Sequence, residues 1–391
     1  MPDFDALNDA LCPFTLLRLR VVLASDRLLR MPAQQGSTIR GALASSLKEL
    51  VCVRRELPQC QPCPLVEDCA YPYFFETIPP AGTPGTRGFE QFPRPYVITY
   101  PAQRTPAGRT AEPGAAGERP PEDGAAEQDE DRANEDPCSR HEIGLTLVGR
   151  AIPLHMYLAL ALRNLENRGI GAGRTHFGLE SIDVLGLDGG RHQIYDGQSG
   201  MLLAPEPVTT GSEVVKEATN AARAAGGSPA QKAGQRNEAR SPGVVVRFVS
   251  PTALNHQGKA AAVPEFHVLV RNVIRRISLL SVGHCRYRMD LPFGDFIAAA
   301  EECELRRVNT RRVSWQRHSA RQVNRVPMSG FLGEVEYDSK ALPFLPLLAL
   351  GSLVHAGDNS AFGMGRYLVR LAGAGGGQNG WFPVGWHLVG E

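Results

Sequence analysis

SAFGMGRYLV, residues 360–369, and GIGAGRTHFGL, residues 169–179, resemble each other, and this internal repeat decides the fold. Each stretch places glycines and an arginine shortly before an apolar run. Each also lies near the end of a segment in which strand-like and helix-like patterns alternate. The repeat therefore indicates one structural unit that occurs twice in the chain.

The segments before the two stretches have the same order of elements. Thr15–Ala24 alternates apolar residues with arginines, which predicts a strand with one buried face. From Ser37 to Leu50 apolar residues recur at helical spacing. The other expected elements are helices at 156–167, 264–282 and 343–355, and strands at 244–254, 308–317, 330–338 and 362–371. This order predicts an α+β fold of two tandem ferredoxin-like, or RRM-like, domains.

Two stretches have compositions that cannot form a core. Residues 101–137 and 205–242 contain almost no large apolar side chain, so burial cannot offset the entropy of ordering them. We expect the first to be a disordered acidic insertion and the second a disordered linker. The expected domains are therefore 1–204 and 243–391, joined by 205–242.

Charge is unevenly distributed along the chain. Residues 101–137 hold ten acids and four arginines, so this insertion carries −6 and the rest of the chain +7, for a total of +1. A basic body suits a polyanionic partner, although a charge of this size is also ordinary for solubility. No apolar run reaches the roughly 20 residues that span a bilayer. We expect a cytoplasmic protein without membrane contact.

Four of the eight cysteines are clustered. Cys52, Cys60, Cys63 and Cys69 have the spacing C-x7-C-x2-C-x5-C, in which the C-x2-C pair can direct two thiolates at one metal ion. The pattern predicts a metal-binding insertion at 52–69 that holds structural zinc, with an iron–sulfur cluster as the less favoured metal. Buried or partly oxidised thiols are the alternative. Four protein ligands leave no open position, so such a site would stabilise and would not catalyse.

Three groups of residues are candidates for phosphate or RNA contact. Glycine lets backbone amides approach a phosphate, and arginine adds a charged fork, although hairpin turns need glycine too. Residues 301–325 are rich in arginine, with Trp315 and His318 between, which is typical of RNA binding but also of a solvated strand. The candidates are Gly171, Gly173 and Arg174; Gly357, Gly363, Gly365 and Arg366; and Arg312, Arg317, His318 and Arg321. Arg271, Arg275 and Arg276 form a further basic patch.

Several motifs together resemble a known family. They are GSTIRG (36–41), CAYPYFFE (69–76), GIGAGRTHFGL (169–179), FVSPTAL (248–254), RHSARQ (317–322), GFLGEVEY (330–337) and LGSLVHAGDNSAFGMGRY (350–367). In these motifs the chain resembles the CRISPR-associated endoribonucleases of the RAMP superfamily, which process precursor crRNA. The resemblance implies two tandem ferredoxin-like folds, repeat RNA as partner and cleavage without a catalytic metal.

The resemblance also implies a mechanism and candidate catalytic residues. The 2′-hydroxyl attacks the adjacent phosphate, the 5′-oxygen leaves, and a 2′,3′-cyclic phosphate remains. Many family members carry a general-base histidine near the first helix, whereas this chain has no histidine before His141. Arg40 and Lys48 are then candidate electrostatic catalysts and His355 a candidate base, with a helix cap as its alternative role. His318 stands where the family often has a stacking aromatic.

Two other functions stay open at this point. The missing early histidine favours a catalytically silent RAMP subunit that binds crRNA inside an effector complex. A zinc-stabilised protein without an RNA role is the third interpretation, which the paired glycine stretches and the arginine-rich strand disfavour.

Overall fold

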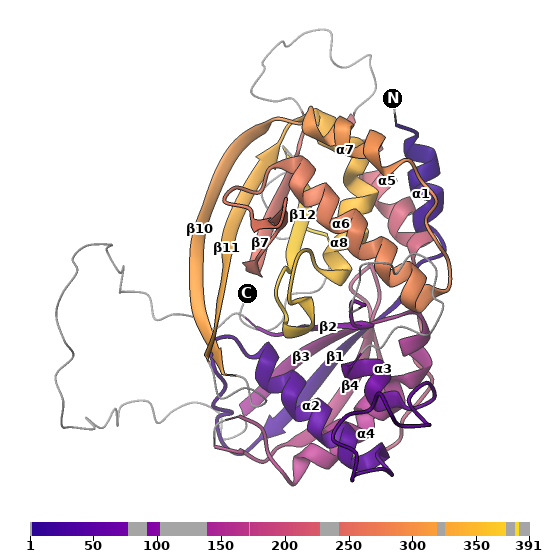
Figure 1. Ribbon diagram of the computed structural model, residues 1–391, viewed down its shortest axis with the longest axis vertical. Coiled ribbons are helices and arrows are strands. Elements are labelled where there is room, and N and C mark those ends of the chain that lie inside the picture. Colours follow the sequence, from indigo (N-terminus) through magenta and orange to yellow (C-terminus); the bar gives the residue numbers. More distant parts are fainter. Residues whose placement is uncertain are drawn as a thin grey trace, which may run out of the picture.

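A computed structural model describes residues 2–76, 92–101, 139–171, 173–226, 242–318, 325–372 and 380–382 (Figure 1). The predicted acidic insertion, apart from Pro101, lies outside these residues. So do Arg321 and residues 227–241 of the predicted linker.

The first half of the chain builds one antiparallel sheet with helices on one face. Its elements are β1 (Thr15–Ser25), α2 (Gly36–Val51), α3 (Ala70–Phe75), β2 (Tyr96–Thr99), β3 (Ser139–Val148), η1 (Gly149–Leu154), α4 (His155–Glu166), β4 (Gly178–Leu185) and β5 (Arg191–Asp196). The strand order is β2-β3-β1-β4-β5. Without β5, a hairpin addition, this is the ferredoxin-like arrangement, with one helix after the first strand and one after the third.

The second half repeats this topology. Its elements are β7 (Val244–Thr252), β8 (Asn255–His256), β9 (Lys259–Ala260), α6 (Phe266–Leu280), η4 (Ser281–Cys285), α7 (Phe293–Glu301), β10 (Leu305–His318), β11 (Arg325–Tyr337), η5 (Ser339–Phe344), α8 (Leu345–Val354), η6 (Ser360–Phe362) and β12 (Tyr367–Leu371). The sheet order is β10-β11-β7-β12. The prediction of two tandem ferredoxin-like folds is confirmed.

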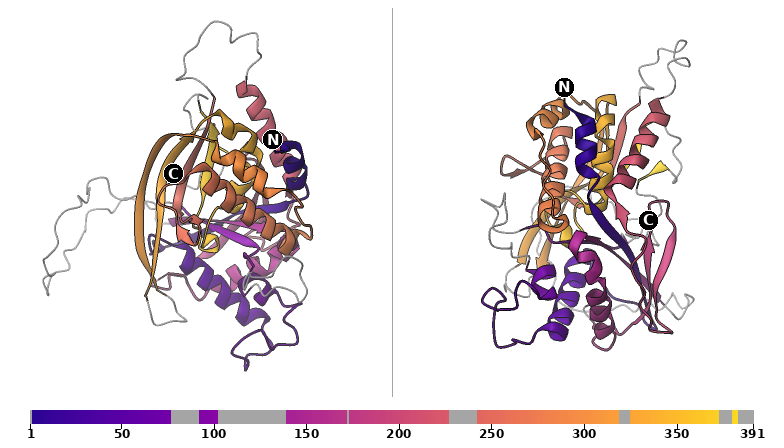
Figure 2. Two further views of the ribbon diagram at one scale, coloured as in Figure 1. Left: turned by 45° about the horizontal axis from the view of Figure 1, so that its top comes forward. Right: turned by 90° about the vertical axis from the view of Figure 1, so that its right-hand side faces the viewer.

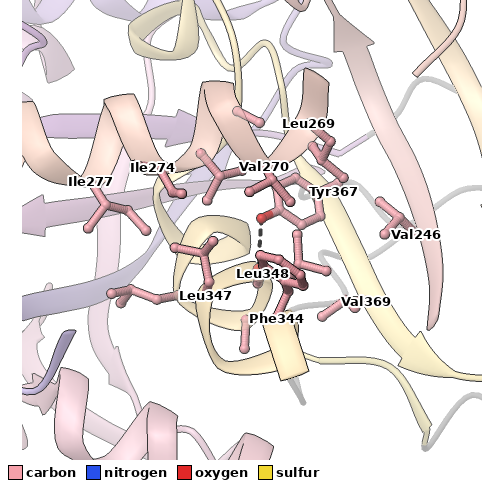
Figure 3. Close-up of a cluster of buried hydrophobic side chains, with 14 of the residues drawn as sticks. Val246, Leu269, Val270, Ile274, Ile277, Phe344, Leu347, Leu348, Tyr367 and Val369 are labelled. Carbon is pink, nitrogen blue, oxygen red and sulfur yellow. Dashed lines mark hydrogen bonds between the residues drawn. The ribbon is translucent and has the colours of Figure 1, made fainter. Parts of the chain in front are cut away.

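The core of the second half is centred on α8. All ten of its residues are buried, because α6, β12 and two further helices surround it. A helix that is apolar on every side is stable only in such a position. Figure 3 shows this core, in which the buried Tyr367 hydroxyl donates a hydrogen bond of 2.7 Å to the Leu348 carbonyl. A satisfied hydroxyl lets the large ring pack without a desolvation penalty.

The two further helices come from outside the predicted second domain. α1 (Phe4–Leu11) packs the Phe4 ring against two rings of the second half. The Phe4 ring centre lies 5.6 Å from that of Phe296 and 4.9 Å from that of Phe344. α5 (Gly211–Gly226) buries Val214 and Ala218 against α8. Figures 1 and 2 show both helices beside the second half of the chain.

The predicted linker is therefore wrong over residues 209–226. β6 (Thr209–Thr210) pairs with β1, and α5 follows it directly. Two small apolar side chains one turn apart suffice to dock α5, because its partner α8 is apolar on its outer face as well. Composition alone did not reveal this contact. The predicted boundary at 204/205 also assigns α1 to the first domain, although α1 packs into the core of the second.

The two domains meet through close backbone approaches at glycines. A Cβ on Gly36, at the start of α2, would lie 1.8 Å from the Phe362 carbonyl oxygen of η6. A Cβ on Gly149 would lie 2.2 Å from the His284 carbonyl oxygen. Real Cβ atoms do not approach so closely, so these two positions require glycine. The junction thus joins α2 to the loop before β12, and η1 to η4.

Candidate functional site

The glycine loop at 355–366 is a junction between the domains. The Gly363 amide donates to the Ser360 carbonyl at 2.9 Å, and the Gly365 amide donates to the Pro251 carbonyl at 3.0 Å. The Arg366 amide donates to Ser250 Oγ at 2.8 Å. These three amides are used inside the protein, and the Arg366 side chain is only 4% exposed. The prediction that Gly363, Gly365 and Arg366 hold a phosphate is wrong for this structure.

Gly357 has a different position in the same loop. It is half-buried, with φ of +75°, and it precedes the exposed Asp358 and Asn359. Asp358 accepts a hydrogen bond from Asn255 Nδ2 at 2.6 Å. Only this edge of the loop reaches the surface, and RNA contact at Gly357 stays a prediction.

His355 is buried beneath the loop and is 2% exposed. Its Nδ1–H donates to the Met364 carbonyl at 3.0 Å, and its φ is +64°. With Arg18 and Arg366 it lines a cavity of about 10 Å³, room for about one water molecule. Burial first, and then the charge of Arg366, lowers the pKa of His355 to about 3. The ring is neutral and out of reach of a substrate, so the prediction of His355 as general base is wrong for this structure.

Arg40 lies at the junction, where α2 faces both α3 and the glycine loop. Its Cζ is 5.0 Å from the centre of the Phe362 ring and 6.0 Å from that of Phe75. Its Nη2 also donates to the Phe75 carbonyl at 3.3 Å. Arg40 is half-buried between two rings from different domains, which fixes its charge in place.

Lys48 lies two helical turns further along the same side of α2. Its Nζ is 5.3 Å from the centre of the Tyr71 ring of α3. Tyr71 and Phe75 are four residues apart on α3, so their side chains lie on the same face of this helix. α3 therefore presents one ring to Lys48 and one to Arg40. A catalytic role for Lys48 stays a prediction.

The first-domain glycine stretch has the opposite exposure from its counterpart. Ile170 pairs with Thr175 across a tight turn, and Gly173 and Arg174 are exposed. Gly171 is half-buried with φ of +81°, and a Cβ there would lie 2.6 Å from the Arg30 carbonyl oxygen. Gly171, Gly173 and Arg174 stay candidates for phosphate contact, with Arg174 the accessible charge.

The edge strand β10 carries a line of exposed basic side chains. They are Arg306, Arg307, Arg311 and Arg312. β10 is the outermost strand of its sheet, and the long β10–β11 hairpin curves from the second domain toward the first (Figures 1 and 2). Arg317 and His318 belong to β10 by their backbone, and the structure does not describe their side chains. Arg312 is thus a surface charge, as predicted, and its RNA contact stays a prediction.

The basic patch predicted on α6 is only partly on the surface. Arg271 and Arg275 are exposed. The guanidinium of Arg276 is buried and its Nε donates to the Val354 carbonyl at the end of α8. Burial lowers the pKa of Arg276 to about 10, which keeps it cationic at neutral pH. A cation at a helix C-terminus stabilises that helix, so Arg276 has a structural role.

A tyrosine–histidine pair that sequence analysis missed forms the second half of the junction. The Tyr73 hydroxyl donates to His284 Nδ1 at 3.2 Å, and His284 Nε2–H donates to the Pro93 carbonyl at 2.8 Å. Burial is the main cause that lowers the pKa of His284 to about 4. Arg150 lies over the Tyr73 ring, with its Cζ 5.5 Å from the centre. These residues are far apart in sequence, so no spacing pattern could have revealed the pair.

The four clustered cysteines line one small cavity. All four are free thiols and partly exposed. Burial is the largest cause that raises the pKa of Cys60 to about 11, so this thiol is protonated at neutral pH. In the described part of the chain, no group of three or more His, Cys, Asp or Glu side chains is already placed to hold a metal. The zinc prediction therefore stays a prediction.

The two tandem ferredoxin-like domains meet at the glycine loop, and two family models match parts of the chain. Residues 246–367 match the family model described as CRISPR-associated endoribonuclease Cas6. Residues 14–207 match a model described as an N-terminal domain. The chain thus contains, in residues 246–367, a domain of the CRISPR-associated endoribonuclease Cas6 family.

Solved structures of Cas6 proteins align with most of the chain at low sequence identity. A Cas6 product complex is 14% identical, with 90% of this chain and 98% of that chain covered and a TM-score of 0.47. Thermus thermophilus Cas6 is 12% identical, with 91% of this chain and 98% of that chain covered and a TM-score of 0.43. A structure described as a RAMP protein binding different RNA substrates is 9% identical, covers 90% and 98%, and has a TM-score of 0.36. No curated protein matches the chain in sequence. None of the described helices is both long and apolar enough to cross a membrane.

Proposed function

We propose that this protein cleaves precursor crRNA within the CRISPR repeat. The observation that carries the proposal is the match of residues 246–367 to the family of CRISPR-associated endoribonucleases. The matched region contains both β10 with its exposed arginines and the glycine loop at the junction. Repeat RNA is accordingly the proposed partner, with the CRISPR effector complex as a further one.

The proposed RNA surface is the basic edge of the second sheet. Four exposed arginines along one strand offer charged forks to successive phosphates. The fold supports this choice, because the β10–β11 hairpin extends toward α2 (Figure 1), the helix that contains Arg40. Arg174, on the exposed turn of the first domain, is the proposed additional contact.

The proposed reaction is attack by the 2′-hydroxyl on the adjacent phosphate without a catalytic metal. The 2′-oxygen bonds to phosphorus, the bond to the 5′-oxygen breaks, and the products are a 2′,3′-cyclic phosphate and a 5′-hydroxyl. The extra negative charge on the phosphorane needs a fixed cation, and in-line positioning supplies much of the remaining acceleration. The position of Arg40 between Phe75 and Phe362 supports it as that cation. The buried His355 is not proposed as the base.

The experiment is a cleavage assay in EDTA with a synthetic repeat RNA. A second RNA carries a 2′-deoxy nucleotide on the 5′ side of the cut. We expect cleavage of the first RNA and not the second, with a cyclic phosphate on the upstream product. Tight binding without cleavage of either RNA would instead identify a silent crRNA-binding subunit, and cleavage of the deoxy substrate would refute the attack by the 2′-hydroxyl.

Arg40 can be tested against a matched substitution just beyond the C-terminus of the same helix. Arg40→Lys keeps the charge but loses the planar stacking on Phe362 and the geometry of the guanidinium fork. Arg55→Lys changes an exposed arginine that donates to the Glu49 carbonyl beyond the end of α2. We expect a lower rate of the chemical step at saturating RNA for Arg40→Lys and an unchanged rate for Arg55→Lys. Equal rates for both would remove Arg40 from the mechanism.

A further inference from the structure

The cysteine segment has little that holds it in place. Residues 52–69 form no helix or strand and connect α2 to α3 through a series of turns. Backbone hydrogen bonds close these turns. The amides of Cys63, Val66 and Cys69 donate to the carbonyls of Cys60, Cys63 and Leu65, at 2.9, 3.1 and 2.9 Å. Two of its larger apolar side chains are exposed, Val53 by 72% and Leu65 by 46%, and Leu57 and Val66 are only half-buried. A segment of this length with so little buried apolar surface needs another source of order.

The fold gathers all four thiols around one small cavity at the start of α3. Cys52 is the first residue after α2, and Cys69 is the residue before α3. Cys60 and Cys63 lie at the two ends of a turn between them. Val51, Tyr71 and Pro72 complete the wall on the protein side. Residues that are up to 17 positions apart thus share one cavity, and the other cysteines that the structure describes, Cys12, Cys285 and Cys303, do not line it.

We propose that Cys52, Cys60, Cys63 and Cys69 bind one structural Zn²⁺ in this cavity. Four thiols lose their protons to solvent, and four thiolates bind the ion tetrahedrally at sulfur–zinc distances of about 2.3 Å. As described, the thiols surround the cavity without converging, so the turns close around the ion when it binds. The turn conformation of the segment allows this, because no sheet or helix hydrogen bond has to break.

The ion would fix the position of α3 and, through it, the two cations on α2. Cys69 directly precedes α3, whose Tyr71 ring lies 5.3 Å from Lys48 Nζ and whose Phe75 carbonyl accepts from Arg40. Metal binding at Cys69 therefore orders the support on which Arg40 rests. This consequence rests on the proposed RNA cleavage, whereas metal binding itself does not.

The experiment measures metal in the purified full-length protein, produced without an affinity tag and after gel filtration. We expect about one zinc per chain by elemental analysis, and the spectrum of a tetrahedral tetrathiolate after replacement by Co²⁺. Cys60→Ser and Cys63→Ser should lose the metal, and the matched control Cys303→Ser, a half-buried cysteine on the far domain, should retain it. Zinc in wild type that is unaffected by Cys60→Ser, or wild-type protein without zinc and without a cobalt spectrum, would overturn the proposal.

Two further readouts cover variants that fold poorly and alternative thiol chemistry. Chelation of wild-type protein should expose the four cysteines to alkylation, detected by peptide mass spectrometry, while Cys12 and Cys303 change little. Disulfides among the four in freshly purified protein, or an iron–sulfur absorption spectrum, would refute the zinc site. Zinc binding in a protein that fails to cleave repeat RNA would leave the metal site standing and refute only the proposed function.

Discussion

Replacing Gly36 by alanine tests the domain junction most directly. In a helix, alanine is favoured over glycine by about 0.5–1 kcal/mol, so helix propensity alone predicts stabilisation. The new Cβ, however, would lie 1.8 Å from the Phe362 carbonyl oxygen, 2.3 Å from its carbonyl carbon and 2.9 Å from its Cα. These are backbone atoms of the other domain and cannot rotate away. The domains must separate by more than about 1 Å, and overpacking of this kind costs about 1–3 kcal/mol.

Gly41 provides the matched control in the same helix. It is exposed, and a Cβ there would meet nothing within 4 Å, so only the propensity gain remains. We expect Gly41→Ala to raise the midpoint of thermal unfolding and Gly36→Ala to lower it. Because both variants share the propensity gain, the gap in unfolding free energy should equal the overpacking cost of about 1–3 kcal/mol, which is a few degrees for a chain of this size. Circular dichroism during heating measures both variants.

The same pair of variants also reports on function. Phe362 contacts Arg40, so a displaced glycine loop removes one of the two rings that hold this cation. Cleavage of repeat RNA by folded Gly36→Ala should therefore be slower than by Gly41→Ala. Equal stabilisation by the two substitutions would refute the described junction, because it would mean that Gly36 does not contact Phe362.

Three other predictions concern the buried histidines and the basic strand. His355→Ala should lower the unfolding free energy by about 2–3 kcal/mol, because the hydrogen bond to Met364 is lost and a cavity is left. The pH profile of cleavage should stay unchanged at a temperature where the variant is folded. Loss of an ionisation from that profile would contradict the buried position of His355. Arg311→Ala and Arg312→Ala should each weaken RNA binding and reduce the salt slope of log K by about 1, whereas Arg191→Ala on β5 should not, as measured by filter binding at several salt concentrations. His284 has a pKa of about 4 in the folded protein, below its ordinary value of about 6.5, so between these two values the unfolded state binds more protons than the folded state. The folded protein should therefore lose about 3 kcal/mol of stability as the pH falls from about 6.5 to about 4. Urea unfolding of His284→Gln should show a correspondingly smaller loss over that window, and an identical loss would show that His284 is not buried.

The strand and helix patterns were sufficient to predict the architecture. Apolar residues recur at strand spacing in Thr15–Ser25 and at helical spacing in α2, which was enough to identify both elements, although β1 proves to be buried on both faces. Even there, tertiary contacts changed the outcome for Arg18. Its position in the alternation predicts an exposed side, but Arg18 is buried and its Nη1 donates to the Gly186 carbonyl.

The helices that complete the second core could not be predicted in the same way. α5 has an Ala-rich sequence with few large apolar residues, which resembles a linker in composition. Its stability comes from α8, a segment more than a hundred residues later whose entire surface is apolar. The apolar surface of α8 that α5 covers is formed only in the assembled fold, so the composition of α5 itself does not indicate that it will pack there.

The sequence by itself determined the tandem fold, the cysteine cluster and the basic strand, because each depends on local periodicity, spacing or charge. Only the tertiary structure decided which candidate residues are accessible. His355, Gly363 and Gly365 have the local signature of a ligand loop, but His355 is buried and the amides of the two glycines bond within the protein. The packing of the two domains also fixes Arg40, since Phe75 of the first domain and Phe362 of the second both contact it. Burial and proximity arise when distant segments pack, and no single segment encodes them.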